Sequence, residues 1–266
     1  MAGPMGGGSR GGGIALDFRR GKTSKKILEI DWVYPVWKPV ERELKPGETT
    51  VAAERERALP LEQAYELATE GDRRPVLIMR ECERCKGTDH ALLTRSLDNE
   101  QTVLLTHWFR CVKLPPNVLS EKHPFYNLFL REKEGERIPH LFFVDPDGKN
   151  KTELPGDQPQ TVLWETMFSY LERCYAEDAK AAIKELRQVL GQYDMIDAKE
   201  VAVKGRIDTE IEKNGPESPK LKPLEADLHK LAKERAVLAA KEKELRDLAL
   251  KAMPATAAPS GSGASK

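Results

Sequence analysis

The chain has 266 residues, of which 39% are hydrophobic and 32% are charged, and its 43 basic and 43 acidic residues balance to a formal net charge of zero. This balance argues against partners that are selected by a strong net charge, such as nucleic acid or an anionic membrane. Four cysteines are too few for a disulfide scaffold in a chain of this length. No apolar run approaches the length of a membrane-spanning helix, and the N-terminus lacks the apolar region of a signal peptide. We therefore expect a cytoplasmic protein.

The first 60 residues are predicted to form no compact unit of their own. Residues 1–26 are rich in glycine and then in basic residues, which predicts a disordered tail. The basic residues would suit contact with RNA or another anion, but a solvated tail is the simpler interpretation. Residues 27–60 hold an apolar cluster broken by Pro35 and Pro39, which predicts an extended segment packed on the main domain.

The most informative stretch is an apolar run that ends in a Cys-x-x-Cys motif. Residues 61–71 have the spacing of an amphipathic helix, and residues 76–79 have the length and composition of a buried strand. Residues 88–96 contain neither Gly nor Pro and carry several aliphatic side chains, so we expect a helix there. Cys82 and Cys85 then fall in the turn between strand and helix.

That position suits thiol chemistry. The first amides of a helix carry a partial positive charge, which favours a thiolate, and the thiolate is the form that attacks a disulfide. Two intervening residues let the second thiol resolve the mixed disulfide made by the first. A Cys-x-x-Cys motif beside a βαβ pattern therefore predicts a redox site.

Two alternatives remain open for the motif. It would be half of a zinc site if Cys111, Cys174 or histidines supplied the other ligands, since a structural zinc site needs four. It would also be inert if the domain were a scaffold whose cysteines do no chemistry.

Further elements follow along the chain. Apolar patterns and turn residues predict a helix at 100–106 capped by Asp98 or Asn99, strands at 108–114 and 141–144, a helix at 125–131, an edge strand at 149–154 after a turn, and a helix from about 158 to 175. Cys111 falls within a strand and is expected to be a buried apolar residue, with a third redox cysteine as the alternative. Cys174 falls on an apolar helix stripe and is expected in the core.

This order of elements, with an Ala-rich helix before RPVLI and the hairpin sequence IPHLFFVDPDGK, resembles the thioredoxin-like family over about residues 61–175. The resemblance implies a three-layer α/β/α fold. It implies that Cys82 is the attacking thiol and Cys85 the resolving thiol. Pro139 would be a cis-proline lying against the cysteines and, with Ile138, would bind an extended substrate strand. No cofactor and no metal are expected.

The chain departs from the family pattern around the cysteines. Glu81 replaces the tryptophan that precedes the first cysteine in thioredoxins, and Glu83-Arg84 replaces the usual Gly-Pro. Arg84 and Lys86 would favour the thiolate, whereas Glu81 and Glu83 would oppose it. These charges nearly cancel, so the sequence gives no direction for the pKa of Cys82.

The C-terminal third has a different composition, rich in Ala, Lys, Glu and Leu. Residues 176–253 show two amphipathic repeats around a break at Asn214-Gly215-Pro216, which predicts an antiparallel coiled-coil hairpin. Such a hairpin would suit a homodimer or a partner helix, and a solvated extension without a partner is the alternative. Residues 254–266 are predicted to be a disordered tail.

Two functions follow from these observations. The first is a thiol–disulfide oxidoreductase that acts on protein disulfides through Cys82 and Cys85, with an unidentified redox partner. The second is a non-catalytic thioredoxin-like interaction module that docks or dimerises through its coiled coil.

Overall fold

The computed structural model describes residues 19–35, 58–81, 90–94, 98–129 and 136–252, and its centre is a mixed five-stranded sheet. The strands lie in the order β1 (Trp32–Val33), β3 (Arg110–Leu114), β2 (Val76–Arg80), β4 (Leu141–Val144) and β5 (Thr152–Leu154). Strands β1, β3 and β2 are parallel, whereas β4 runs antiparallel to β2 and β5 antiparallel to β4. The chain is therefore an α/β protein, and each strand predicted from residue 76 onwards is present.

Both faces of the sheet are buried. On β2, Leu77 and Met79 belong to a core shared with α3 (Glu100–Thr106), α4 (Gln160–Cys174) and the first half of α5 (Ala179–Asn214). Val76 and Ile78 belong to a second core, shared with α2 (Leu61–Thr69) and the 3-10 turns η1 (Pro116–Leu119) and η2 (Tyr126–Phe129). Burial on both faces of the sheet explains why residues 76–79 of β2 are all apolar instead of alternating with polar residues.

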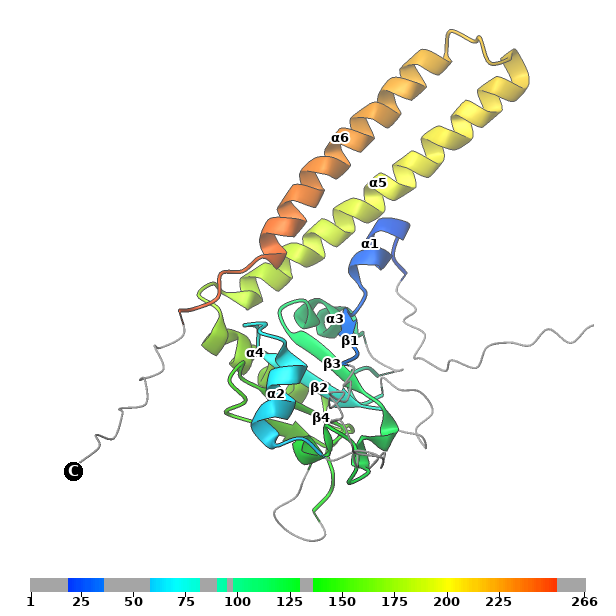
Figure 1. Cartoon of the computed structure of the whole chain (residues 1–266). Coiled ribbons are helices and arrows are strands. Elements are labelled where there is room, and N and C mark those ends of the chain that lie inside the picture. Colours follow the sequence, from blue (N-terminus) through cyan, green and yellow to red (C-terminus); the bar gives the residue numbers. More distant parts are fainter. Residues whose placement is uncertain (1–18, 36–57, 82–89, 95–97, 130–135, 253–266) are drawn as a thin grey trace, which may run out of the picture.

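Helices α5 and α6 (Leu221–Arg246) form an antiparallel hairpin that projects beyond the sheet (Figure 1). Ala182, Ile183 and Leu186 in the first half of α5 pack into the core of the sheet domain. Farther out, the two helices share a small core of their own, formed by Ile196, Val203 and Leu231. The predicted helical hairpin is confirmed.

The chain returns to the sheet domain after α6. The amide of Ala176 donates to Ala249 O at 2.8 Å, and the amide of Lys251 donates to Cys174 O at 2.8 Å. The hairpin is thus fastened at both of its ends.

Helix α1 (Lys22–Ile27) lies within the segment predicted to be disordered. It packs on α5, where Asp194 and Asp197 accept hydrogen bonds from the amides of Gly21 and Thr23, both at 2.7 Å. The disorder expected for residues 1–26 is therefore wrong for residues 22–26, and residues 1–18 lie outside the described part. Because the partners of this polar helix lie about 170 positions away on α5, its local sequence carried no signal for it.

Two other expected helices differ from the structure. Residues 90–92 form a turn, and 93–94 are irregular, where a helix was predicted over 88–96. The side chain of Asn99 bonds both the amide of Thr94, at 2.9 Å, and its carbonyl, at 2.6 Å, and so replaces helical hydrogen bonds. The helix predicted at 125–131 is the shorter 3-10 turn η2.

The remaining predicted segments agree in part. In the segment 27–60, β1 is the extended edge strand, and residues 36–57 lie outside the described part. All residues of the predicted tail at 254–266 also lie outside it. None of the described helices is long and apolar enough to cross a membrane.

Candidate functional site

The predicted site residues divide into two groups. Cys82, Glu83, Arg84, Cys85 and Lys86 lie outside the described residues. Glu81, Ile138 and Pro139 are described: Glu81 directly follows β2, and the carbonyls of Ile138 and Pro139 contact Arg80 at the end of that strand. We call this region, formed by Arg80, Glu81, Lys113 and residues 138–140, the carboxyl-end site.

Arg80 joins β2 to the segment that leads into β4. Its amide donates to His140 O at 2.9 Å, and its guanidinium donates to Pro139 O at 3.0 Å and, more weakly, to Ile138 O at 3.5 Å. The segment that the resemblance assigned to substrate binding is therefore attached to a residue two positions before Cys82.

The proline in this segment does not have the predicted geometry. No cis peptide bond occurs in the described ranges, so the Ile138–Pro139 bond is trans and the expectation of a cis-proline is wrong. The trans form is the lower-energy form of an X–Pro bond. The carbonyl of this peptide bond, Ile138 O, and the next carbonyl, Pro139 O, both face the Arg80 side chain.

The charges at the carboxyl-end site are not equally paired. Burial lowers the pKa of the Arg80 guanidinium, and the described acceptors around it are neutral carbonyls. The Glu81 carboxylate, in contrast, lies 3.7 Å from the Nζ of Lys113, a buried lysine whose Nζ lies 5.3 Å from the centre of the Trp32 ring. Of the residues that the structure describes, two cations and one carboxylate therefore lie at the end of β2.

His140 borders the same site. Its Nδ1 lies 2.8 Å from Pro155 O, and because a carbonyl only accepts, this nitrogen carries the proton. Burial lowers the pKa of His140 below its usual 6.5, so the ring is neutral at pH 7. Gly156, with φ of +98°, lies so close that an added Cβ would be 2.9 Å from His140 Cβ.

A shallow cavity of about 300 Å³ lies next to this glycine. The turn at residues 90–94 forms one wall, and residues 156–158 with the start of α4 form the other. The cavity is therefore lined by His90, the first described residue after the Cys-x-x-Cys motif.

The other two cysteines lie apart from this site. Cys111 is buried in β3, where its thiol contacts Thr106 O at 3.6 Å, and burial raises its pKa to about 12. Cys174 is partly buried at the end of α4, and its pKa is raised to about 11 by burial and by Asp145. Cys111 is thus the buried residue that was predicted, and neither thiol ionises readily at neutral pH.

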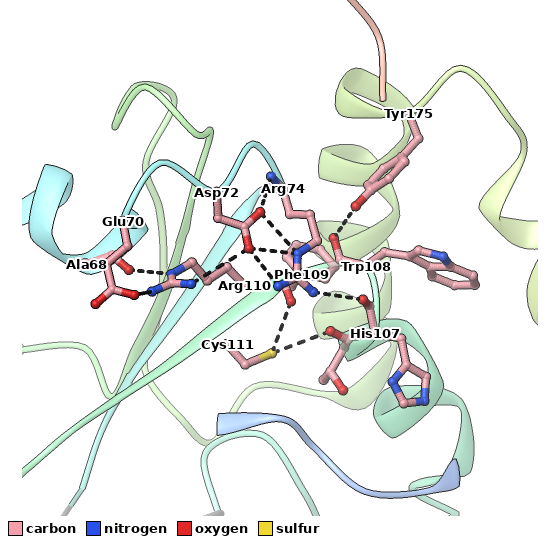
Figure 2. Close-up of polar contacts among 11 residues, drawn as sticks. Ala68, Glu70, Asp72, Arg74, His107, Trp108, Phe109, Arg110, Cys111 and Tyr175 are labelled. Atoms are coloured by element: carbon pink, nitrogen blue, oxygen red, sulfur yellow. Dashed lines mark hydrogen bonds and ion pairs between the residues drawn. The ribbon is translucent and has the colours of Figure 1, made fainter. Parts of the chain in front are cut away.

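The amino ends of β2 and β3 carry a polar network that sequence reasoning missed (Figure 2). Asp72 accepts hydrogen bonds from the Arg74 side chain, the shortest at 2.7 Å, and lies 3.8 Å from Arg110. Arg110 also donates to Ala68 O at 2.6 Å and to Glu70 at 2.7 Å. We call this the amino-end network. An arginine at the start of a strand expected to be buried was the signal that could have revealed it.

The amino-end network also holds the loop between α3 and β3. Arg74 donates to His107 O at 3.3 Å, and the Tyr175 hydroxyl donates to Trp108 O at 2.8 Å (Figure 2). Its charged groups are matched by partners of opposite sign, which is typical of a structural role.

Within the described ranges, no group of three or more His, Cys, Asp or Glu side chains is placed to hold a metal ion. Because Cys82 and Cys85 lie outside those ranges, the zinc alternative stays a hypothesis.

Comparisons with protein-family models, with curated proteins and with solved structures give no match for this chain. Any functional assignment therefore rests on the residues and geometry given above.

Proposed function

We propose that residues 61–175 form a thioredoxin-like domain and that the protein is a cytoplasmic thiol–disulfide oxidoreductase for protein substrates. The observation that carries this proposal is the position of the Cys-x-x-Cys motif in the sequence. It follows directly on a central buried strand, at the end where the segment 138–140 is attached. The described elements α2, β2, α3, β3, β4, β5 and α4 also occur in the order on which the family resemblance was based, except that residues 90–92 form a turn where a helix was expected and 126–129 form a 3-10 turn.

The reaction needs one low-pKa thiol and one resolving thiol. The Cys82 thiolate attacks a substrate disulfide, which forms a mixed disulfide and releases one substrate thiolate. The Cys85 thiolate then attacks Cys82 Sγ and releases the second substrate thiolate. The substrate gains two electrons, the Cys82–Cys85 pair becomes a disulfide, and a dithiol partner protein must reduce it again.

The raised pKa values of Cys111 and Cys174 support this assignment of roles. A thiol with a pKa near 11 or 12 is almost wholly protonated at pH 7 and attacks slowly. The two motif cysteines are therefore the remaining candidates for the nucleophile.

The direct test is turnover in a disulfide-reduction assay with a protein substrate. We expect Cys82→Ser to abolish turnover and Cys85→Ser to accumulate a covalent mixed disulfide with the substrate. Cys174→Ser is the matched control and should keep full activity. If Cys82→Ser and Cys85→Ser both retain the parent rate, the proposed activity is wrong.

A second candidate is a non-catalytic interaction module, which the outer half of the hairpin favours. Met195, Val201 and Val237 are 56%, 72% and 70% exposed there. Such a module would bind a partner helix or a second copy of the chain through α5 and α6.

Excision of the outer hairpin tests this candidate. Replacing residues 195–237 by a short Gly-Ser linker removes all three exposed side chains and keeps the half of α5 that packs into the sheet domain. If the protein is an interaction module, this variant loses oligomerisation or partner capture, whereas the cysteine variants do not. If it is an oxidoreductase, the excised variant keeps its turnover.

A further inference from the structure

Helix α1 and the residues just before it carry cations that no described acidic side chain neutralises. Residues 19–26 hold five basic residues and no acidic residue. One of the five, Arg20, is paired with Glu100 and Asp194, both at 2.7 Å. The other four are exposed and form no ion pair or side-chain hydrogen bond with any residue that the structure describes: Arg19, Lys22, Lys25 and Lys26. The chain as a whole is neutral, so this positive charge is a local feature.

The three lysines lie on one side of the helix. Their spacing of i, i+3 and i+4 places Lys25 and Lys26 beside Lys22, with Cβ atoms about 5–6 Å apart. The opposite side, with Ser24 and Ile27, is buried. We call the three lysines together with Arg19 the basic face of α1.

The basic face has a fixed position, because α1 is held against α5 (Figure 1). The Thr23 hydroxyl donates to the Asp197 carboxylate at 2.8 Å. The Ser24 hydroxyl donates to Leu190 O at 2.9 Å. A set of charges that is ordered before a partner binds loses less conformational entropy on binding than a disordered arm would.

The chemistry of this face distinguishes between anionic partners. Insertion into a membrane needs apolar side chains beside the charges, but Ile27 and Leu28 are 6% and 3% exposed and belong to the core. Binding of single-stranded nucleic acid uses aromatic rings that stack on bases, and residues 19–26 contain none.

Closely spaced phosphates fit the basic face better than carboxylates do. A nucleic-acid duplex carries one negative charge roughly every 2 Å along its axis. An extended acidic peptide spaces its charges at least about 3.3 Å apart. A compact group of four cations therefore meets more negative charge on a duplex than on a peptide.

We propose that the basic face of α1 binds the phosphate backbone of double-stranded RNA. RNA is the nucleic acid that a cytoplasmic protein meets, so this choice rests on the location proposed above. Contacts to phosphates carry no sequence information, so binding is independent of base sequence.

The test is the affinity of the full chain for an RNA duplex of about 20 base pairs, measured by fluorescence anisotropy between about 50 and 200 mM salt. The variant carries Lys22→Gln, Lys25→Gln and Lys26→Gln together. We expect its affinity at the lowest salt to be about tenfold weaker or more. The slope of log K against log salt should become shallower by about 3, since each lysine–phosphate contact contributes about 1.

A matched control removes the same charge at the tip of the hairpin. Lys213, Lys220 and Lys222 are also exposed, and the tip lies roughly 25 Å along α5 from Asp197. Their joint replacement by Gln should leave the affinity within about twofold of the parent, because salt screens charges at that distance. Thermal unfolding of both triple variants confirms that folded proteins are compared.

Three results would overturn the inference. The first is that the parent does not bind the duplex. The second is an equal loss of affinity in the two triple variants, because binding would then follow net charge. The third is displacement of the duplex by polyglutamate at equal charge concentration, which would indicate an acidic protein partner.

This experiment is separable from the proposed activity. Binding requires no thiol chemistry, so Cys82→Ser should bind the duplex as tightly as the parent does. Failure to bind RNA would leave the oxidoreductase proposal intact, and failure of disulfide reduction would leave the binding result intact.

Discussion

The two ends of the central parallel strands use charged residues in different ways. At the amino ends of β2 and β3, Arg74 and Arg110 are paired with Asp72 and Glu70, and the network also holds backbone carbonyls. At the carboxyl end of β2, the described partners of Arg80 are neutral carbonyls, and the described partner of Glu81 is Lys113, at a longer distance of 3.7 Å. The paired end has the properties of a structural clamp, and the less completely paired end lies beside the motif that we propose as the reactive site.

The largest expected effect on stability comes from removing Arg110 from the amino-end network. Arg110→Met keeps the apolar stem but leaves the Ala68 carbonyl and the carboxylates of Glu70 and Asp72 without this donor. We expect the free energy of unfolding to fall by about 2–3 kcal/mol, because the buried Ala68 carbonyl and the largely buried Asp72 carboxylate lose a charged donor, whereas the 58% exposed Glu70 carboxylate is hydrated again. Chemical denaturation measures this change.

Arg137→Met is the matched control for that experiment. The Arg137 side chain is 63% exposed and its bridge to Asp157 is 3.2 Å long, so we expect less than about 0.5 kcal/mol. Equal losses in the two variants would contradict the structural role given to the amino-end network.

A pH-dependent change in the free energy of unfolding, of similar or smaller size, is expected from His107. This residue joins the amino-end network to the hairpin, because its carbonyl accepts from Arg74 and its ring contacts Arg246 of α6. Burial and the neighbouring Arg246 lower the pKa of His107 to about 4. The unfolded chain binds the proton near pH 6.5, so stability is full above that pH and falls until about pH 4, by roughly 2–3 kcal/mol. Unfolding free energies measured from pH 7.5 to pH 4 give the slope.

His107→Gln provides the comparison, because glutamine does not titrate. Its stability should change less with pH over the same window than that of the parent protein. Identical slopes in the two proteins would show that His107 is not the group responsible.

The last prediction changes no residue and compares how readily Cys111 in β3 and Cys82 after β2 are alkylated. We expect Cys111 to stay unmodified when folded protein is treated with iodoacetamide at pH 8, because its thiol is buried with a pKa raised to about 12. Cys82 should be modified under the same conditions. Mass spectrometry of the digested protein reads both sites, and rapid labelling of Cys111 would contradict the difference drawn between the two ends.

Strong periodic patterns were sufficient for much of the fold. The apolar run at residues 76–79 became β2, and the Leu and Ile repeats after residue 176 became α5 and α6, because burial of each pattern leaves few alternatives. Helix α1 had no such pattern, since it depends on Asp194 and Asp197 from a distant helix.

The candidate site was only partly predictable. The Cys-x-x-Cys motif and the segment 138–139 were identified from the sequence, and the structure attaches that segment to the strand that leads into the motif. Arg80 was not singled out, because its bonds to the carbonyls of Ile138 and Pro139 join segments 58 and 59 positions apart. Contacts of this kind follow from tertiary packing and leave no trace in the local sequence.

The most direct test of the central claim is a redox titration of the Cys82–Cys85 pair. Thiols are alkylated and counted by mass after equilibration in glutathione or dithiothreitol buffers. We expect one reversible two-electron transition between about −300 and −120 mV, absent from Cys82→Ser. Two thiols that remain free at every potential would contradict a redox site at the carboxyl end of β2.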